Sequence, residues 1–417
     1  MSITAIRGFN DILPEEAELW RRIEEESVNV FASYGFSEIK APIVERTELF
    51  LRSIGETTDI VEKEMYTFLD RNGDSLTLRP EGTAPVVRAY IEHRLYECPV
   101  TKLYYAGPMF RYERPQKGRY RQFYQIGAEV LGDASPKADA ETLEMLMRLF
   151  ETIGLKGAVL QINSLGCPGC RPAYKELLYA FLLERKESLC VNCIRRMDTN
   201  PLRALDCKNP GCIEATKDAP PIAESLCADC AGHFRAVQST LGRLGIEASI
   251  NKRMVRGLDY YTKTTFEITA SGLGAQNAVA AGGRYDGLVS GLGGPETPCF
   301  GFAMGIERVA LLLKENGFLK RRPLSVFIAM GDEAELKGVE LLREWRKKGI
   351  RIVEDFSEGS LKSRMKRADR IRARYALILG TDELRHGEIT VKDMTTAGQE
   401  RLKWEIVADR ISSAEGY

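Results

Sequence analysis

The sequence has no excess of charge of either sign and no long apolar run. Lysine and arginine together number 59, as do aspartate and glutamate, so the formal net charge is zero. Bulk attraction to a polyanion is therefore not expected, and any contact with nucleic acid must come from local basic patches. No run approaches the roughly 18 apolar residues that a membrane span needs, and residues 1–16 lack the apolar core of a signal peptide. We expect a cytoplasmic protein with no membrane association.

The chain of 417 residues is long enough for two or three domains, and its ten cysteines are unevenly spread. The length, the missing signal segment and the paired spacing favour reduced thiols over disulfides. Three cysteine pairs have the Cys-x-x-Cys spacing at which two thiolates can bind one metal ion, and two such pairs would complete a tetrahedral zinc site. We interpret the thiols as metal-free and keep structural zinc as the alternative. The four pairs are Cys167 with Cys170, Cys190 with Cys193, Cys207 with Cys212, and Cys227 with Cys230.

A basic hairpin between residues 102 and 130 is the most informative stretch. Strand-forming residues run to Tyr112, turn residues follow from Pro115 to Gly118, and an alternating strand returns from Phe123 to Val130. The period of two puts Tyr124, Ile126, Ala128 and Val130 on a core-like face and Phe123, Gln125, Gly127 and Glu129 on the other.

The second face of this hairpin suits a small polar ligand. Gln125 offers an amide, Glu129 offers a carboxylate, and Gly127 between them leaves room for the ligand. A hairpin with one solvated face is the alternative. The loop favours the ligand, because its five cations suit phosphates better than they suit each other. These cations are Arg111, Arg114, Lys117, Arg119 and Arg121.

Flanking segments predict an ordered framework. Pro14 begins an amphipathic helix that ends at Gly35, and residues 36–44 form a strand that Pro42 restricts to an edge or an interface. A second helix begins at Ser135-Pro136. The Gly-rich stretch 272–294 lacks the strand and helix of a dinucleotide-binding loop, so we expect it to let backbone approach a flat ligand.

The C-terminal part predicts a small parallel α/β domain after a linker at residues 321–323. Strands at 325–330, 350–353 and 375–379 alternate with helices at 334–348 and 361–373. The second helix is basic and presents either a solvated face or a surface for RNA phosphates. Its cations are Lys362, Arg364, Lys366, Arg367, Arg370, Arg372 and Arg374.

Four strings resemble those of class II aminoacyl-tRNA synthetases of the bacterial histidyl type. Residues 110–123 resemble motif 2, and residues 301–311 resemble motif 3. Residues 256–261 and 281–288 resemble the two histidine signatures of this family. The first helix and the Pro42 strand resemble motif 1 loosely, which implies a homodimer.

The resemblance implies a mixed α/β fold. An antiparallel sheet with flanking helices would form a catalytic domain at residues 1–166 and 246–320, interrupted by a small Cys-rich helical insertion at 167–245. The family does not depend on metal in that insertion. Residues 324–417 would form an α/β anticodon-binding domain.

The resemblance also implies ATP with Mg²⁺, L-histidine and histidine tRNA as ligands. Arg111, Arg256 and Arg308 would be catalytic, with Arg111 and Arg308 binding ATP. Glu81 would bind the substrate ammonium, although it could instead cap the helix that follows. The full histidine-binding set implied is Glu81, Gly82, Thr83, Gln125, Glu129, Arg256, Tyr260 and Tyr261, and Arg114, Gln116 and Arg121 would touch the tRNA acceptor end.

Two rival functions share this resemblance. A histidyl-like regulatory subunit of ATP phosphoribosyltransferase has the fold without aminoacylation, but it generally lacks the last domain. A histidyl-like sensor of a larger kinase would need a kinase signature, and none is present. The sequence therefore favours the ligase.

Overall fold

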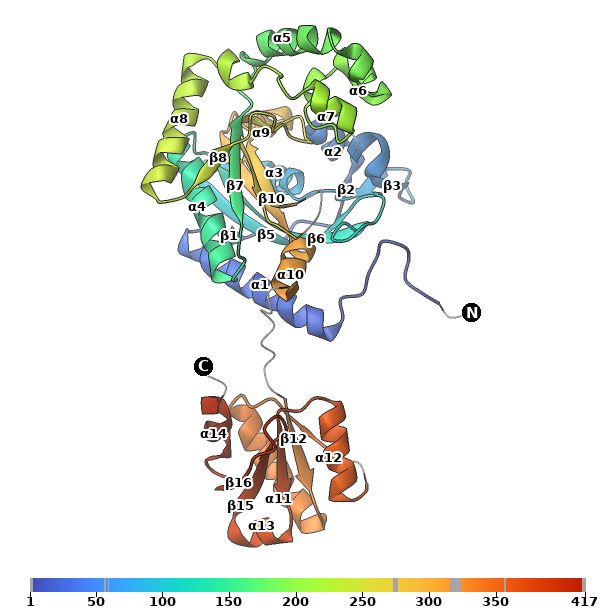
Figure 1. Cartoon of the computed structure of the whole chain (residues 1–417), viewed down its shortest axis with the longest axis vertical. Helices are drawn as coiled ribbons and strands as arrows, with labels where there is room; N and C mark the ends of the chain where they lie inside the picture. The colour runs from blue at the N-terminus through green and yellow to red at the C-terminus, as the bar shows by residue number, and fades with distance from the viewer. Residues whose placement is uncertain are drawn as a thin grey trace. The chain divides into compact units, whose positions relative to one another are not determined.

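The computed structural model describes residues 3–55, 58, 60–272, 277–315, 324–355 and 358–414. The chain divides into two compact units, Met1–Leu319 and Lys320–Tyr417 (Figure 1). The expected linker at 321–323 lies outside the described residues. Within the described ranges, no helix has the length and apolar character to cross a membrane.

The first unit is built on a sheet that has eight strands in the described residues. Neighbouring strands from β5 to β7 are antiparallel, and only the outermost pairs, β1 with β5 and β7 with β8, are parallel. This confirms the expected antiparallel catalytic sheet. In spatial order the strands are β1 (Ser37–Glu38), β5 (Thr101–Phe110), β6 (Gln122–Leu131), β11 (Cys299–Gly305), β10 (Ala278–Arg284), β9 (Thr262–Thr269), β7 (Val159–Ser164) and β8 (Ala248–Ile250).

Helices cover the apolar face of this sheet. The core there contains Ile126, Ala128 and Val130 of β6, as the period of two predicts. The helices packed on it are α1 (Pro14–Ser33), α4 (Pro136–Thr152), α8 (Ala228–Arg243) and α10 (Ile306–Glu315) (Figure 1). On the opposite face α3 (Thr83–Glu92) and α9 (Leu288–Gly291) pack on β5. On this face, Phe123 and Gln125 at the start of β6 line a cavity, whereas Glu129 further along the strand is buried.

The predicted continuous strand at residues 36–44 is wrong. The chain leaves β1 at Glu38 and enters a separate sheet, whose strands are β2 (Val44–Arg46), β4 (Ser75–Leu78) and β3 (Tyr66–Leu69), with α2 (Thr47–Ile54) following β2. Pro42 has no N–H to donate to a ladder. Arg79 Nη1 instead donates to the Ala41 carbonyl at 2.9 Å, which fixes the crossing segment.

The Cys-rich segment between β7 and β8 is helical, as predicted. Its helices before α8 are α5 (Arg171–Leu183), α6 (Val191–Met197) and α7 (Pro210–Ala215). They share a small core around Tyr174, Leu178 and Leu182, into which the buried Cys193 and Cys212 also pack.

The second unit begins with the predicted βαβαβ alternation but is not wholly parallel. β12 (Ser325–Ala329) pairs in parallel with β13 (Ile352–Glu354) and β14 (Tyr375–Leu379), with α11 (Asp332–Lys347) and α12 (Leu361–Arg370) between them. After β14 the chain passes through α13 (Thr381–His386) into antiparallel β15 (Glu388–Asp393) and β16 (Gln399–Lys403), and ends with α14 (Val407–Ala414). The connection from β14 to β15 is shorter than the dozen or so residues that a parallel crossover needs.

The basic segment around α12 is less free than the sequence suggests. Arg364 is buried and donates to the Ala329 carbonyl at 2.6 Å. Arg367 and Arg374 pair with acidic groups, Asp355 at 3.0 Å and Asp393 at 2.9 Å. The exposed cations of this segment are Lys362, Lys366, Arg370 and Arg372.

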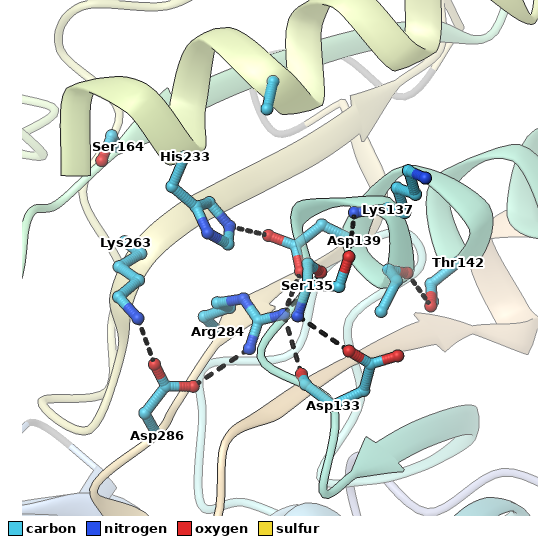
Figure 2. A network of polar contacts seen from close by, with 12 residues as sticks. Asp133, Ser135, Lys137, Asp139, Thr142, Ser164, His233, Lys263, Arg284 and Asp286 are labelled. Atoms are coloured by element: carbon cyan, nitrogen blue, oxygen red, sulfur yellow. Dashed lines mark hydrogen bonds and ion pairs between the residues drawn. The ribbon is translucent and has the colours of Figure 1, made fainter. Parts of the chain in front are cut away.

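A buried polar network fastens the sheet to two of its helices (Figure 2). The fully buried Arg284 at the end of β10 lies 2.7 Å from Asp139 of α4 and 3.2 Å from Asp286. His233 of α8 contacts the other oxygen of Asp139 at 2.8 Å, and Lys263 of β9 donates to Asp286 at 2.9 Å. Arg284 and Asp286 belong to the second histidine signature, and here they hold the sheet and its helices together.

We expect Arg284→Met to lower the free energy of unfolding by about 3–5 kcal/mol, because it leaves the carboxylate of Asp139 buried without its charged partner. Arg94→Met is the matched control, since Arg94 and its partner Glu97 are exposed and such pairs contribute about 0–1 kcal/mol. Denaturant unfolding of both variants measures the difference. Equal stability of the two variants would contradict the network's role.

Candidate active site

A cavity of about 320 Å³ opens on the polar face of the sheet. Arg111 from the hairpin, Arg256 from the segment before β9 and Arg308 from α10 all line it. Three cations that are far apart in the sequence are thus brought to one space. Of the other predicted residues, Glu81, Thr83, Gln125, Tyr260 and Tyr261 also line the cavity.

Backbone carbonyls hold two of these arginines in place. Arg111 Nε donates to the Pro80 carbonyl at 2.8 Å, and its guanidinium lies over the Phe123 ring at 5.3 Å. Arg308 donates to the carbonyls of Ala278 at 2.6 Å and Gly118 at 3.3 Å. Since a guanidinium has five N–H groups, each retains donors that can reach a ligand.

Arg256 is held by an acidic partner that the sequence analysis missed. Its Nη1 donates to Glu267 of β9 at 2.7 Å, and its guanidinium lies 5.4 Å from the centroid of the Tyr261 ring. Its buried Nε has no hydrogen-bond partner among the described residues. Strand alternation could have found Glu267, because it lies between the core residues Phe266 and Ile268 and must face the opposite side.

Glu81 caps a helix and also lines the cavity. Its two carboxylate oxygens accept from the backbone N–H groups of Thr83 at 2.7 Å and Ala84 at 2.8 Å, at the start of α3. The capping interpretation is therefore confirmed, and ammonium binding by Glu81 stays a prediction. Each carboxylate oxygen has a further lone pair for a ligand.

Glu129 lies behind the cavity wall, fully buried. Thr83 Oγ1 donates to one carboxylate oxygen at 2.7 Å, and Tyr285 donates to the other at 2.5 Å. Tyr285 belongs to the second histidine signature and stacks edge-on against Tyr260, with ring centroids 5.7 Å apart. The string 281–288 contained this signal, although no role was assigned to Tyr285 from it.

The sequence suggested that Gly127 leaves room for a ligand, but the structure fills this space with a tyrosine ring. A Cβ atom on Gly127 would come within 2.3 Å of the Tyr105 ring, and one on Gly82 within 2.1 Å. The two glycines accommodate a tyrosine from the neighbouring strand, whose register places Tyr105 opposite Gly127. The buried Tyr105 hydroxyl has no hydrogen-bond partner among the described residues.

The glycines of β10 also serve strand packing. A Cβ on Gly282 would lie 2.1 Å from the Gly301 carbonyl, and one on Gly283 would lie 2.5 Å from the Thr264 carbonyl. Neighbouring backbone therefore requires these glycines. The part of this strand that lines the cavity is Ala278 to Ala281.

The cations of the hairpin loop lie in different surroundings, so they do not form one cluster. Arg119 lines the cavity and pairs with the buried Glu113. Arg121 stacks on the Tyr112 ring at 3.8 Å, outside the cavity. Arg114 and Gln116 line an adjoining groove, which shares Glu113 and Arg119 with the cavity.

Burial shifts the acidic groups of the site toward their neutral forms. Burial raises the pKa of Glu129 from 4.5 to about 8, although the hydrogen bonds from Tyr285 and Thr83 oppose the shift. Burial also raises the pKa of Glu307, beside Arg308, to about 7, and it raises the pKa of Glu81. Glu129 and Glu307 therefore have pKa values near neutral pH.

Groups of three or more side chains that could hold a metal occur, within the described ranges, only in the insertion. They are two sets of four cysteines. In the cavity, oxygen ligands of the kind that Mg²⁺ prefers are available singly from Glu267 and Glu307, which both flank Arg308.

The first unit has an antiparallel sheet and an arginine-lined cavity. Residues 325–414 of the second unit match the family described as an anticodon binding domain. Together these features place the chain among the aminoacyl-tRNA synthetases. Residues 8–309 match the family described as histidyl-tRNA synthetase. The chain therefore belongs to the histidyl-tRNA synthetase family.

Individual relatives are similar over nearly the whole chain. The histidine–tRNA ligase of Trichlorobacter lovleyi is 59% identical over 406 residues, 97% of each chain. That of Geobacter sulfurreducens is 58% identical over 413 residues, 98% of this chain and 100% of the relative. The structure of apo histidyl-tRNA synthetase from S. aureus has 39% identity and a TM-score of 0.79, covering 98% of this chain and 100% of that one.

The pKa of Glu129 leads to a testable pH dependence. Between its unfolded pKa of 4.5 and its folded pKa of about 8, the folded protein holds a proton that the unfolded chain has lost. The stabilisation from this proton is complete below the unfolded pKa and is lost as the pH rises through the folded pKa, with a slope of up to about 1.4 kcal/mol per pH unit. Glu129→Gln cannot ionise, so its stability relative to the parent should increase between about pH 5 and pH 8.5.

Denaturant unfolding of parent and variant at several pH values measures this difference. Glu184→Gln is the matched control, because the Glu184 side chain is 76% exposed. Its stability should run parallel to that of the parent across the same range. A parallel profile for Glu129→Gln would contradict the raised pKa.

Proposed function

We propose that the chain is a histidine–tRNA ligase that works in two steps. The carboxylate oxygen of L-histidine attacks the α-phosphorus of ATP, and the bond to pyrophosphate breaks, giving histidyl-adenylate. A ribose hydroxyl of the terminal adenosine of histidine tRNA then attacks the histidyl carbonyl carbon, and AMP leaves. The observation that carries the proposal is one cavity that brings together Arg111, Arg256 and Arg308. Beside them lies the buried amide oxygen of Gln125, which has no hydrogen-bond partner among the described residues.

The arginines would reduce the electrostatic barrier of the first step. An anion must approach a triphosphate while negative charge builds at the phosphorus, and preorganised guanidinium groups stabilise that charge without deprotonating. Arg111 would bridge the histidine carboxylate and the α-phosphate. Arg256 would lie on the opposite side, and Arg308 would hold the far end of the nucleotide. Glu267 and Glu307 offer carboxylate oxygens that would hold Mg²⁺, and the ion would neutralise negative charge on the phosphates of ATP.

The histidine substrate would bind beside β6. Its ammonium would donate to Glu81 and to the Gln125 oxygen, a buried acceptor that lacks a partner among the described residues. Its imidazole would meet Glu129 and Tyr261, while Tyr260 and the backbone near Gly82 complete the pocket. A site built on such hydrogen bonds rejects analogues without the polar atoms by about 10⁴-fold or more.

The remaining features of the proposal concern partners. The exposed cations of α12 would contact phosphates of the tRNA, in keeping with the match to an anticodon binding domain.

A homodimer would use the small sheet near Pro42, where Ile43, Val44, Phe68 and Leu69 are exposed apolar side chains. We place the enzyme in the cytoplasm, where its tRNA substrate is found. The regulatory-subunit alternative is less supported, because the anticodon-binding unit is present.

ATP–pyrophosphate exchange tests the first step. We expect histidine alone among the twenty amino acids to stimulate exchange without tRNA. We expect Arg256→Gln to lower the rate by about 10²–10³-fold, since it removes a fixed charge from the transition state. The control Arg235→Gln, an exposed residue of α8, should exchange like the parent.

Absence of exchange with histidine in a folded sample would overturn the catalytic assignment. Binding of a phosphoribosyltransferase subunit would then be the next measurement. Full exchange by Arg256→Gln would remove only that residue from its role.

Variants of Gln116 and Arg114 should distinguish the second step of the reaction from the first. Because they line the groove that adjoins the cavity and not the cavity itself, Gln116→Ala should lower kcat/KM for tRNA charging by about tenfold, the value of one lost hydrogen bond. Exchange should stay normal. Gln238→Ala on α8 is the control, and a Gln116→Ala enzyme that charges tRNA like this control would exclude Gln116 from the acceptor contact.

A further inference from the structure

The eight cysteines of the insertion form two sets of four. The first set combines the first pair in the sequence with the last, and the second set combines the two middle pairs. Within each set all four sulfur atoms lie within 4.8 Å of one another, and every cysteine is a free thiol. The first set is Cys167, Cys170, Cys227 and Cys230, and the second set is Cys190, Cys193, Cys207 and Cys212.

The sulfur spacing fits a single tetrahedral ion. Zinc bonds thiolate sulfur at about 2.3 Å, so two ligands of a regular tetrahedron lie about 3.8 Å apart. The Sγ atoms of Cys167 and Cys170 are 3.6 Å apart, and those of Cys190 and Cys207 are 3.8 Å apart. We propose that each set binds one Zn²⁺ ion as a structural site. All four positions are taken by protein ligands, which leaves none open for catalysis.

Backbone N–H groups orient the sulfur atoms across the pairs. The N–H of Cys227 donates to Cys170 Sγ at 3.2 Å in the first set, and the N–H of Cys190 donates to Cys212 Sγ at 3.1 Å in the second. In each case the donor belongs to one pair and the acceptor to the other. Such bonds stabilise thiolates and fix ligand direction, as the surroundings of a metal site do.

The placement of the two sets explains what the ions would do. The first set joins the chain just after β7 to the first turn of α8, where the insertion leaves the catalytic sheet and returns to it. The second set joins α6 to α7. The insertion has only a small apolar core of its own, and small units of this kind commonly need metal ions or disulfides for stability.

The insertion also supports the loop that carries catalytic side chains. Arg203, between α6 and α7, donates to the Gly257 carbonyl at 2.9 Å and to Asp259 at 3.0 Å. These acceptors lie in the segment that supplies Arg256, Tyr260 and Tyr261. Zinc in the insertion would therefore keep this part of the cavity in position without touching the substrates.

Metal analysis by mass spectrometry on the full-length protein, purified without chelator and reconstituted with Zn²⁺, tests the proposal. We expect two zinc ions per chain. Cys170→Ser and Cys193→Ser should each retain one ion, because each removes a ligand from one set only. Cys98→Ser, which changes an exposed cysteine outside both sets, should retain two.

Thiol reactivity of the unmodified protein provides a second measurement that does not depend on the folding of a variant. With zinc bound, a thiol reagent should react with the exposed Cys98 and not with Cys227, although both are exposed. A mercurial should bind the eight thiolates of the two sets and thereby release two zinc ions per chain. Well under one zinc ion per chain, iron in its place, or immediate reaction of Cys227 in the untreated protein would overturn the proposal.

Discussion

Fixed positive charge in a half-buried cavity is the constraint on which the rest of the first unit depends. A guanidinium can stabilise charge that develops at a phosphate only if it does not have to move. Arg111 is therefore tied to the Pro80 carbonyl, and Arg308 to the Ala278 carbonyl. Because these carbonyls belong to other segments of the chain, the turn after β4 and the edge of β10 must both be in register before the charges are in place. The Arg284 network supplies that register at the far end of β10.

The floor of the cavity shows how backbone and side-chain packing jointly set the pocket. Tyr105 fits between Gly82 and Gly127, and any larger residue at either glycine would overlap its ring. This tyrosine lies over Gly127, on the face of β6 that also carries Gln125 and Glu129. The two glycines therefore make room for Tyr105, a contact that the hairpin pattern alone did not reveal.

The family resemblance predicted the fold class and the antiparallel catalytic sheet. Local patterns predicted individual helices and the βαβαβ start of the second unit, because alternating strands and capped helices are local features. It did not predict that Pro42 lies in a crossing between two sheets, since the partner Arg79 is distant in the sequence. In the second unit, the basic run looked like one surface, but Arg364 is buried and Arg367 pairs with Asp355. Those partners come from neighbouring strands, which no local pattern shows.

The candidate site likewise contains residues that the sequence could identify and residues that only the structure reveals. The arginines and Gln125 could be found because motif strings fix their identity, and the structure brings them together in one cavity. The position of Tyr105 could be understood only with the strand register known. Glu267 and Tyr285 left a signal in the sequence, the first in the strand alternation and the second in the string 281–288. The cysteines are the clearest case. Their spacing gave four pairs, but which pairs meet depends on where α5 to α8 return, and that depends on tertiary structure.

In the proposed function, the buried carboxyl of Glu129 would give the pocket its selectivity for a ring that both donates and accepts protons. Burial favours the protonated form of Glu129 and raises its pKa to about 8. A neutral imidazole has one N–H and one bare nitrogen, so it can receive this proton or donate its own to the carboxylate. Either arrangement would leave one proton shared between the carboxyl group and the ring nitrogen. A substrate without ring nitrogens leaves the carboxyl facing an apolar surface, and the loss of that hydrogen bond is a larger penalty than any difference in side-chain size.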